Sequence, residues 1–135
     1  DSFHAVMALR ENAVGYVTDV CVPISELARC FLHAKEIVKD ATVPAPVFGH
    51  VGDGNFHVVF PLDPDRPAEL AEVTGYHQQL IDMALSVGGT CTGEHGIGLG
   101  KREALKQEHG QAVDTMKRIK LALDPLNIMN PGKVV

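Results

Sequence analysis

The sequence predicts an α+β fold of the ferredoxin-like class, in which an antiparallel sheet carries helices on one face, followed by a C-terminal helical segment. The order of the expected elements predicts the class, and the length and composition predict the number of domains. Stretches with the period of strands and helices alternate along the first two thirds of the chain in the order strand, helix, strand, strand, helix, and glycine and proline clusters separate them. With 135 residues, 45% of them hydrophobic, the chain can bury one core, so we expect a single domain over residues 1–135.

The first strand and the first helix are expected between residues 15 and 40. The segment GYVTDVCVP, residues 15–23, is rich in β-branched residues, and we expect a strand that Pro23 ends. Ser25 is expected to cap the next helix. The apolar positions of this helix recur at helical spacing, and they are Leu27, Phe31, Ala34 and Val38.

A second long helix is expected after the proline-rich segment PLDPDRPAE, residues 61–69. Its apolar stripe runs from Leu70 to Ala84, and Gly88-Gly89 is a strong stop signal. A short strand around Thr90 to Gly93 would complete the ferredoxin-like order. The last third predicts loop and short helix, with a final helix marked by apolar positions from Val113 to Leu123.

A β-hairpin is expected between these helices, with strands over residues 47–51 and 55–60. If the chain turns on the two residues Asp53-Gly54, then His50 faces His57, and residues directly opposite each other share a face of the sheet. Two imidazoles at that spacing can converge on one zinc ion. The histidines could equally be ordinary strand residues whose rings bond across the hairpin.

A third ligand has a candidate in GTCTGEHGIGLGK, residues 89–101, where Glu94 and His95 are adjacent in a run with five glycines. Such glycine density lets a backbone approach a ligand closely. Glu94 could bind a metal ion, and His95 could act as a base. A solvated loop without catalytic function is the alternative.

Charge, hydropathy and cysteine usage exclude several function classes. The formal net charge is −5, and no run of Lys or Arg could follow a phosphate backbone, so we expect no nucleic-acid partner. No apolar run approaches the ~20 residues of a transmembrane helix. The three cysteines are odd in number and form no C-x-x-C pair, which favours a cytoplasmic or other reducing compartment.

Four segments resemble one known family. The runs TDVCVPISEL, GHVGDGNFHV, GTCTGEHGIGLGKR and LDPLNIMNPGKVV are similar to the C-terminal, substrate-side domain of FAD-linked D-2-hydroxyacid dehydrogenases and oxidases. The cytochrome-type D-lactate dehydrogenases are the nearest branch, and glycolate oxidase and D-2-hydroxyglutarate dehydrogenase are related. The resemblance covers nearly the whole chain from about Thr18.

The resemblance implies one part of a two-part flavoenzyme, whose N-terminal FAD-binding domain is absent here, so that the fragment alone is expected to be inactive. It implies that His50, His57 and Glu94 bind a divalent metal ion, Zn or Mn. It implies that His95 accepts a proton and that Asn130 lies near the FAD.

The implied substrate is a small D-2-hydroxy acid, with D-lactate favoured, which is oxidised to the 2-keto acid. Relatives that act on longer diacids use a lysine near Val17, which this chain lacks. Arg10 lies in the region of the family's substrate-carboxylate arginine, but we do not assign it that role. Loss of the flavin domain would expose apolar surface, so a homo-oligomer is open, as is a peripheral link to a membrane through the electron acceptor. The competing hypothesis is a non-catalytic ferredoxin-like module that binds a metal or a partner.

Overall fold

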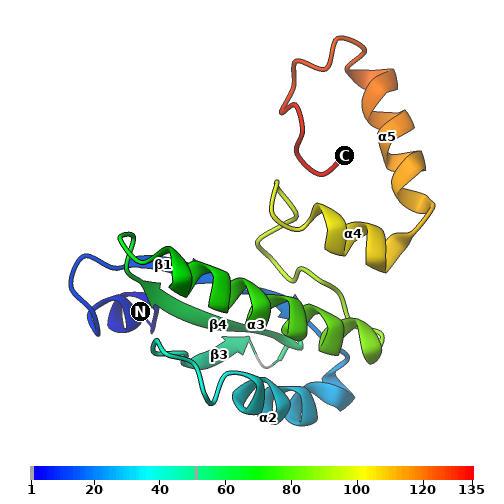
Figure 1. Cartoon of the computed structure of the whole chain (residues 1–135). Helices are drawn as coiled ribbons and strands as arrows, with labels where there is room; N and C mark the ends of the chain where they lie inside the picture. Colours follow the sequence, from blue (N-terminus) through cyan, green and yellow to red (C-terminus); the bar gives the residue numbers. More distant parts are fainter. Residues whose placement is uncertain (1, 51) are drawn as a thin grey trace. The chain divides into compact units, whose positions relative to one another are not determined.

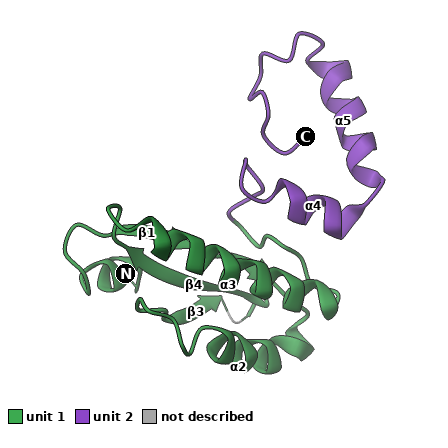
Figure 2. Cartoon of the chain, viewed as in Figure 1, with its two compact units in different colours: residues 1–94 green, residues 95–135 purple. Residues whose placement is uncertain are grey.

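A computed structural model describes residues 2–50 and 52–135. The contacts divide the chain into two compact units, residues 1–94 and residues 95–135, which Figure 2 colours separately. The single domain expected over residues 1–135 stays a prediction.

The first unit contains the sheet, and the second is helical (Figure 1). The elements of the first unit are α1 (Ser2–Met7), β1 (Val14–Val17), β2 (Val20–Cys21), the 3-10 helix η1 (Ile24–Glu26), α2 (Leu27–Ile37), β3 (Val47–His50), β4 (Asn55–Leu62) and α3 (Pro67–Ser86). Those of the second unit are α4 (Arg102–His109) and α5 (Ala112–Leu123). Among the described residues, none of the helices is both long and apolar enough to span a bilayer.

The central strand of the sheet is β4, in which every residue is buried. β3 pairs antiparallel with it along one edge. β1 and β2 pair with it in one continuous register, because Val17 lies opposite Val59 and Val20 lies opposite Phe56. They are therefore two halves of one interrupted strand. An isolated bridge from Cys21 to Thr90 stands where a fourth strand would lie.

The resulting order is the Thr90 bridge, β1 with β2, β4 and then β3, which is the ferredoxin-like order. The predicted α+β fold with an antiparallel sheet is confirmed. The strand expected at residues 90–93 is reduced to that single bridge.

The interruption between β1 and β2 falls at Thr18-Asp19, inside the segment predicted as one strand. The hydroxyl of Thr18 takes the place of a backbone group, because Val58 donates its N–H to Thr18 Oγ1 at 2.8 Å. The carboxylate of Asp19 accepts hydrogen bonds from backbone N–H groups of Gly93 and Glu94. These side-chain bonds compete with the regular ladder and divide the strand.

The two faces of the sheet differ in what covers them. Phe31 of α2 packs edge-on against Phe56, and Tyr76 of α3 stacks on Phe60, so α2 and α3 cover the same face (Figure 1). Because side chains alternate along a strand, His57 points to the opposite face. We call this second side of the sheet the open face.

A short helix that the sequence did not predict, α1, lies at one end of the open face. A Cβ atom added to Gly15, whose position on β1 points to this face, would come within 2.8 Å of the ring of Phe3. A larger side chain there would have to displace the ring of Phe3, because the helix packs directly on the strand. Elsewhere the open face carries apolar residues such as Phe48 and Val59, together with the polar side chains of His50, Asn55 and His57.

The N-terminal cap expected at Ser25 was wrong. The 3-10 helix η1 precedes α2, with Pro23 at its N-cap and no side-chain capping bond. Glu26 donates its N–H to the carbonyl of Pro23 at 2.8 Å, so the chain is already turning when it reaches Ser25. The second long helix, α3, agrees with its predicted extent.

Candidate metal centre

The histidine hairpin forms with a register different from the one expected. Phe48 lies opposite His57, and His50 lies opposite Asn55, so the prediction that His50 faces His57 was wrong. β3 ends at His50 and β4 begins at Asn55, so four residues rather than two separate the paired positions. Val51, the end of the predicted strand, lies outside the described residues. Asp53 donates its N–H to the carbonyl of His50 at 2.9 Å, and Gly54 has a φ of +75°. A longer turn was needed to close the hairpin.

The two histidines nevertheless lie on the same face. Both the expected and the observed connections have an even number of residues, and the period of two along a strand therefore keeps His50 and His57 on one side. Their ring centroids are 6.0 Å apart in an edge-on arrangement. The two imidazoles converge diagonally across the strand pair.

Glu94 completes this cluster. Its Oε1 lies 3.2 Å from Nε2 of His57 and 3.5 Å from Nε2 of His50. One ligand atom from each of the three residues lies within 4.8 Å of the other two. Two atoms bound tetrahedrally to zinc at ~2.0–2.1 Å stand about 3.3 Å apart, so these spacings fit a shared ion.

The tautomer of His57 supports the same arrangement. Its side chain is 6% exposed, and its Nδ1 lies 3.1 Å from the carbonyl oxygen of Thr18. Since a carbonyl oxygen only accepts, Nδ1 carries the proton and donates it. In the neutral ring Nε2 then presents a lone pair to the carboxylate of Glu94, and two electron-pair donors this close need a cation or a proton between them. The donor set of two imidazoles and one carboxylate suits Zn or Mn.

A cavity of about 370 Å³ opens beside these ligands. Its lining residues are Cys21, His50, Asp53, Asn55, Gly93 and Glu94. Burial, together with the nearby charges of Asp19 and Asp53, raises the pKa of the Cys21 thiol. The thiol also lies 3.3 Å from the carbonyl of Asp53, to which it donates. The thiol of Cys21 therefore lines the cavity in its protonated form, and we do not expect it to act as a nucleophile.

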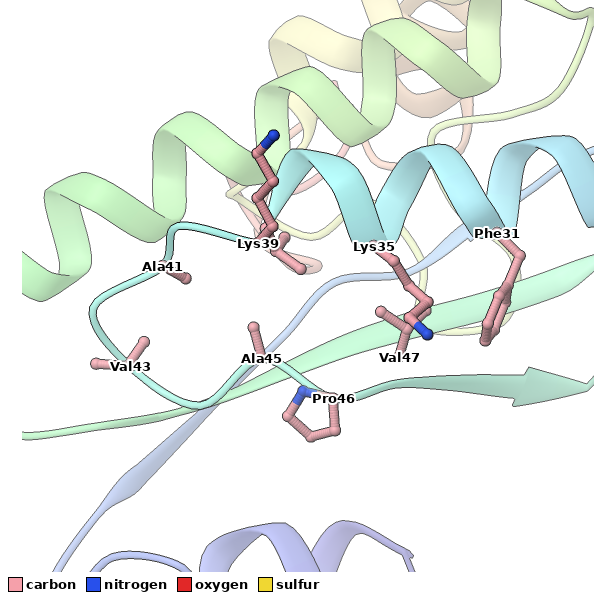
Figure 3. Close-up of a pocket in the computed structure, with 9 residues that line it drawn as sticks. Phe31, Lys35, Lys39, Ala41, Val43, Ala45, Pro46 and Val47 are labelled. Carbon is pink, nitrogen blue, oxygen red and sulfur yellow. The ribbon is translucent and has the colours of Figure 1, made fainter.

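A second hollow, of about 430 Å³, lies between α2, the segment after it and the start of β3. Figure 3 shows the side chains that line it, among them Phe31, Val47 and the two lysines Lys35 and Lys39. None of its lining residues is a His, Cys, Asp or Glu. It therefore offers no set of metal ligands, unlike the first cavity.

Two of the predicted site residues belong to the second unit. His95 follows Glu94 directly in the chain and begins that unit. Asn130 lies in the turn of the terminal N-P-G-K run with a φ of +46°, a left-handed conformation that asparagine tolerates. Their roles as proton acceptor and flavin neighbour stay predictions.

Arg10 is committed to ion pairs. Its guanidinium donates to both carboxylate oxygens of Glu69, at 2.7 and 3.0 Å, and to Asp63 at 3.2 Å. These bonds connect the segment after α1 to the first turn of α3. In this unit Arg10 is a structural residue, which agrees with leaving the substrate-carboxylate role unassigned.

Asp19, which is fully buried beside the candidate ligands, was not among the residues predicted for the site. Its position in an otherwise apolar, β-branched segment was the available signal, because a buried carboxylate must be compensated by hydrogen-bond donors. The identity of those donors depends on residues more than 30 positions away in the chain, and no local pattern could reveal them.

Comparisons with known proteins found one matching family and several relatives. The family of FAD linked oxidases, C-terminal domain, matches residues 2–134. The chain is 48% identical to a Danio rerio protein named "Probable D-lactate dehydrogenase, mitochondrial" and 41% identical to the Arabidopsis thaliana "D-lactate dehydrogenase [cytochrome], mitochondrial"; both matches cover 100% of this chain, and 27% and 24% of the relatives. It is 37% identical to the Bacillus subtilis "Glycolate oxidase subunit GlcD", over 86% of this chain and 25% of that protein. The chain thus spans about a quarter of the length of these relatives.

Proposed function

Because the chain belongs to the family of FAD-linked oxidase C-terminal domains, we propose that it is the metal-bearing substrate domain of a flavoprotein that oxidises a small D-2-hydroxy acid. The observation that carries this proposal is the convergence of His50, His57 and Glu94 beside a polar cavity on the open face. The names of the relatives, D-lactate dehydrogenases and a glycolate oxidase subunit, support a substrate of this size.

The proposed site divides the work among a few side chains. His50, His57 and Glu94 would hold Zn²⁺ or Mn²⁺ beside the cavity. A divalent ion in that place acts as a Lewis acid and lowers the pKa of a bound hydroxyl group. A hydroxy acid in the cavity would lie next to these ligands.

The oxidation needs one proton acceptor and one hydride acceptor. His95 would accept the proton of the substrate hydroxyl, and the hydride on C2 would pass to FAD, which yields the 2-keto acid and balances the reaction. FAD would be held mainly by the flavin-binding domain, with Asn130 of this chain near it. Without that domain the hydride has no acceptor, so we expect the isolated chain not to oxidise D-lactate.

Val17 supports a monoacid substrate such as D-lactate. Relatives that act on longer diacids resemble this chain in the first strand but carry a lysine near that position. A valine cannot pair with a second carboxylate, so the site is expected to favour lactate or glycolate over a diacid.

The first test is the metal content of the purified chain, measured by elemental mass spectrometry after exposure to zinc and manganese. We expect close to one ion per chain, and loss of that ion in the double variant His50→Ala/His57→Ala. The matched control is His33→Ala/His109→Ala, which also removes two imidazoles, both from exposed helical positions. Absence of metal in the parent chain would contradict the proposed metal site.

The second test separates catalysis from a non-catalytic binding module. In the chain joined to a flavin-binding domain, Glu94→Gln and His95→Gln should each lower D-lactate turnover with a dye acceptor by at least about a hundredfold. A binding module predicts unchanged turnover in both variants. Turnover by the isolated chain with no flavin domain present would contradict the division of labour proposed above.

A further inference from the structure

We propose that Asp19 is a positioning residue that orients the candidate ligands Glu94 and His57 for metal binding. The inference rests on the proposed metal site, and it concerns a side chain that would not touch the ion itself. Asp19 lies in the interruption between β1 and β2, and its side chain is fully buried.

The carboxylate of Asp19 forms hydrogen bonds with residues 92–94, which we call the ligand segment because it ends at Glu94. Its Oδ2 accepts hydrogen bonds from Thr92 Oγ1 at 2.9 Å, from Gly93 N at 2.8 Å and from Glu94 N at 3.1 Å. Three consecutive residues therefore donate to one buried oxygen. Charge-assisted hydrogen bonds are the strong ones, and a cluster of three leaves the backbone at Glu94 little freedom.

The other oxygen of Asp19 connects to the hairpin. Oδ1 accepts a hydrogen bond from Asn55 Nδ2 at 2.8 Å and lies 3.6 Å from Nδ1 of His57. Asn55 is the first residue of β4, and it also donates to the carbonyl of Val20 at 2.9 Å. A single carboxylate thus sets the spacing between the strand that carries His57 and the segment that carries Glu94.

The negative charge of Asp19 lets both carboxylate oxygens accept hydrogen bonds from the donors around it. Burying a carboxylate is costly unless donors surround it, and here four donors do so. An asparagine in its place would turn an NH₂ group toward backbone N–H donors or toward the amide of Asn55. The ligand segment would then lose its anchor, although the hydrophobic core under α2 and α3 would be untouched.

The main experiment measures zinc affinity of the 135-residue chain by competition with a chromogenic zinc indicator. Outer groups that orient metal ligands typically contribute about 10- to 100-fold in affinity, and we expect Asp19→Asn to weaken zinc binding by that factor. The matched control is Glu69→Gln, which alters another buried carboxylate that accepts a backbone N–H, that of Asp63 at 3.0 Å, but lies on α3 away from the ligands. The control should bind zinc as the parent does.

A second pair of variants keeps the test decisive if Asp19→Asn does not fold. Thr92→Val removes one donor and keeps the side-chain shape, whereas Thr92→Ser keeps the hydroxyl. We expect Thr92→Val to weaken zinc binding severalfold and Thr92→Ser to restore it. Amide hydrogen exchange of the metal-free chain should show faster exchange at Gly93 and Glu94 in Asp19→Asn and in Thr92→Val, but not in Thr92→Ser.

The outcomes distinguish the two proposals. A parent chain that binds no zinc overturns the proposed metal site and this inference with it. A parent that binds zinc, together with Asp19→Asn and Thr92→Val variants of unchanged affinity, overturns the role of Asp19 alone. Equal weakening by Glu69→Gln would reduce the effect to general destabilisation and would also overturn it.

Discussion

At the scale of single residues, the close approach of Gly93 to its neighbours controls the candidate site. A Cβ atom at this position would lie 1.8 Å from Asn55 Nδ2 and 2.8 Å from Asp19 Oδ1. Only a residue without a side chain lets the backbone of the ligand segment reach the buried carboxylate. This close contact explains one of the five glycines in the run around Glu94.

We therefore expect Gly93→Ala to lower the free energy of unfolding by about 1–3 kcal/mol, because the added methyl group forces the backbone and Asn55 apart. The measurement is urea denaturation followed by circular dichroism. Gly52→Ala is the control, since a Cβ atom there meets nothing within 4 Å and the residue does not have a positive φ. Equal stability of the two variants would show that the Gly93 contact is not constrained.

At the scale of elements, α3 agrees with the sequence because its signals are local. Pro67 begins the helix, the apolar stripe packs on the sheet, and Gly88 follows its end with a φ of +75°. Proline at the start and glycine beyond the end of a helix need no tertiary information to be recognised. By contrast, the start of α2 depends on a 3-10 turn that the capping pattern around Ser25 did not indicate.

Two glycines of this region should respond to alanine in opposite directions. Gly75 is exposed in the middle of α3, and Gly88 lies beyond its end; a Cβ atom at either position meets nothing within 4 Å. We expect Gly75→Ala to raise the free energy of unfolding by about 0.5–1 kcal/mol, since alanine favours helix. Gly88→Ala should lower it by about 1 kcal/mol, because of its positive φ. Urea denaturation of both variants checks the signs, and equal signs would contradict this account.

The ion pair between Arg10 and Glu69 should make the stability of the fold depend on acid pH. The hydrogen bond from Arg10, together with the backbone N–H of Asp63, lowers the pKa of Glu69 below its usual 4.5. A carboxyl group whose pKa is lower in the folded state stabilises the fold fully above the unfolded value. That contribution is lost as the pH falls below 4.5 and through the folded value.

We expect the urea midpoint of the parent to fall below pH 4.5 more steeply than that of Glu69→Gln, which has no proton to gain at this position. Arg10→Met should weaken the same acid dependence, because it removes the group that contributes most to the lowered pKa of Glu69. A Glu69→Gln variant whose midpoint changes with pH as steeply as that of the parent would rule out this ion pair as the cause.

At the scale of the whole molecule, the two units differ in how much they bury. The first unit has an apolar core built on β4, whereas the buried residues described in the second unit are Lys101, Ala104, Leu105 and Asp124. The second unit exposes several large apolar side chains, among them Leu123, Leu126, Ile128 and Met129. Exposed apolar groups of this kind are typical of surfaces that contact another protein or domain.

We therefore expect the isolated chain to self-associate as its concentration rises, which sedimentation velocity would detect. Replacing Leu123 and Leu126 with glutamine should shift the chain toward monomer. Joining the chain to a flavin-binding domain should have the same effect if that domain covers this surface. A parent chain that stays monomeric at high concentration would contradict the prediction.

The hairpin shows how far the sequence could predict the candidate site. The shared face of His50 and His57 was predicted correctly from the period of two along a strand, although the predicted register was wrong. Turn length depends on the backbone angles at Gly54 and on the bond from Asp53 to His50, which the residue types did not specify. The wrong turn length did not change which face the two histidines share, because any even number of turn residues keeps them on the same face.

The sequence by itself determined the fold class, the extent of α3 and the family. Periodicity, glycine and proline at the ends of elements, and long motifs are all local properties of the chain. It also supplied the ligand candidates His50, His57 and Glu94. Only the tertiary structure brought Glu94 to the histidines and divided the first strand at Asp19. The reason is physical: a buried carboxylate selects its donors by proximity in space, and Thr92, Gly93 and Glu94 lie more than 70 residues further along the chain.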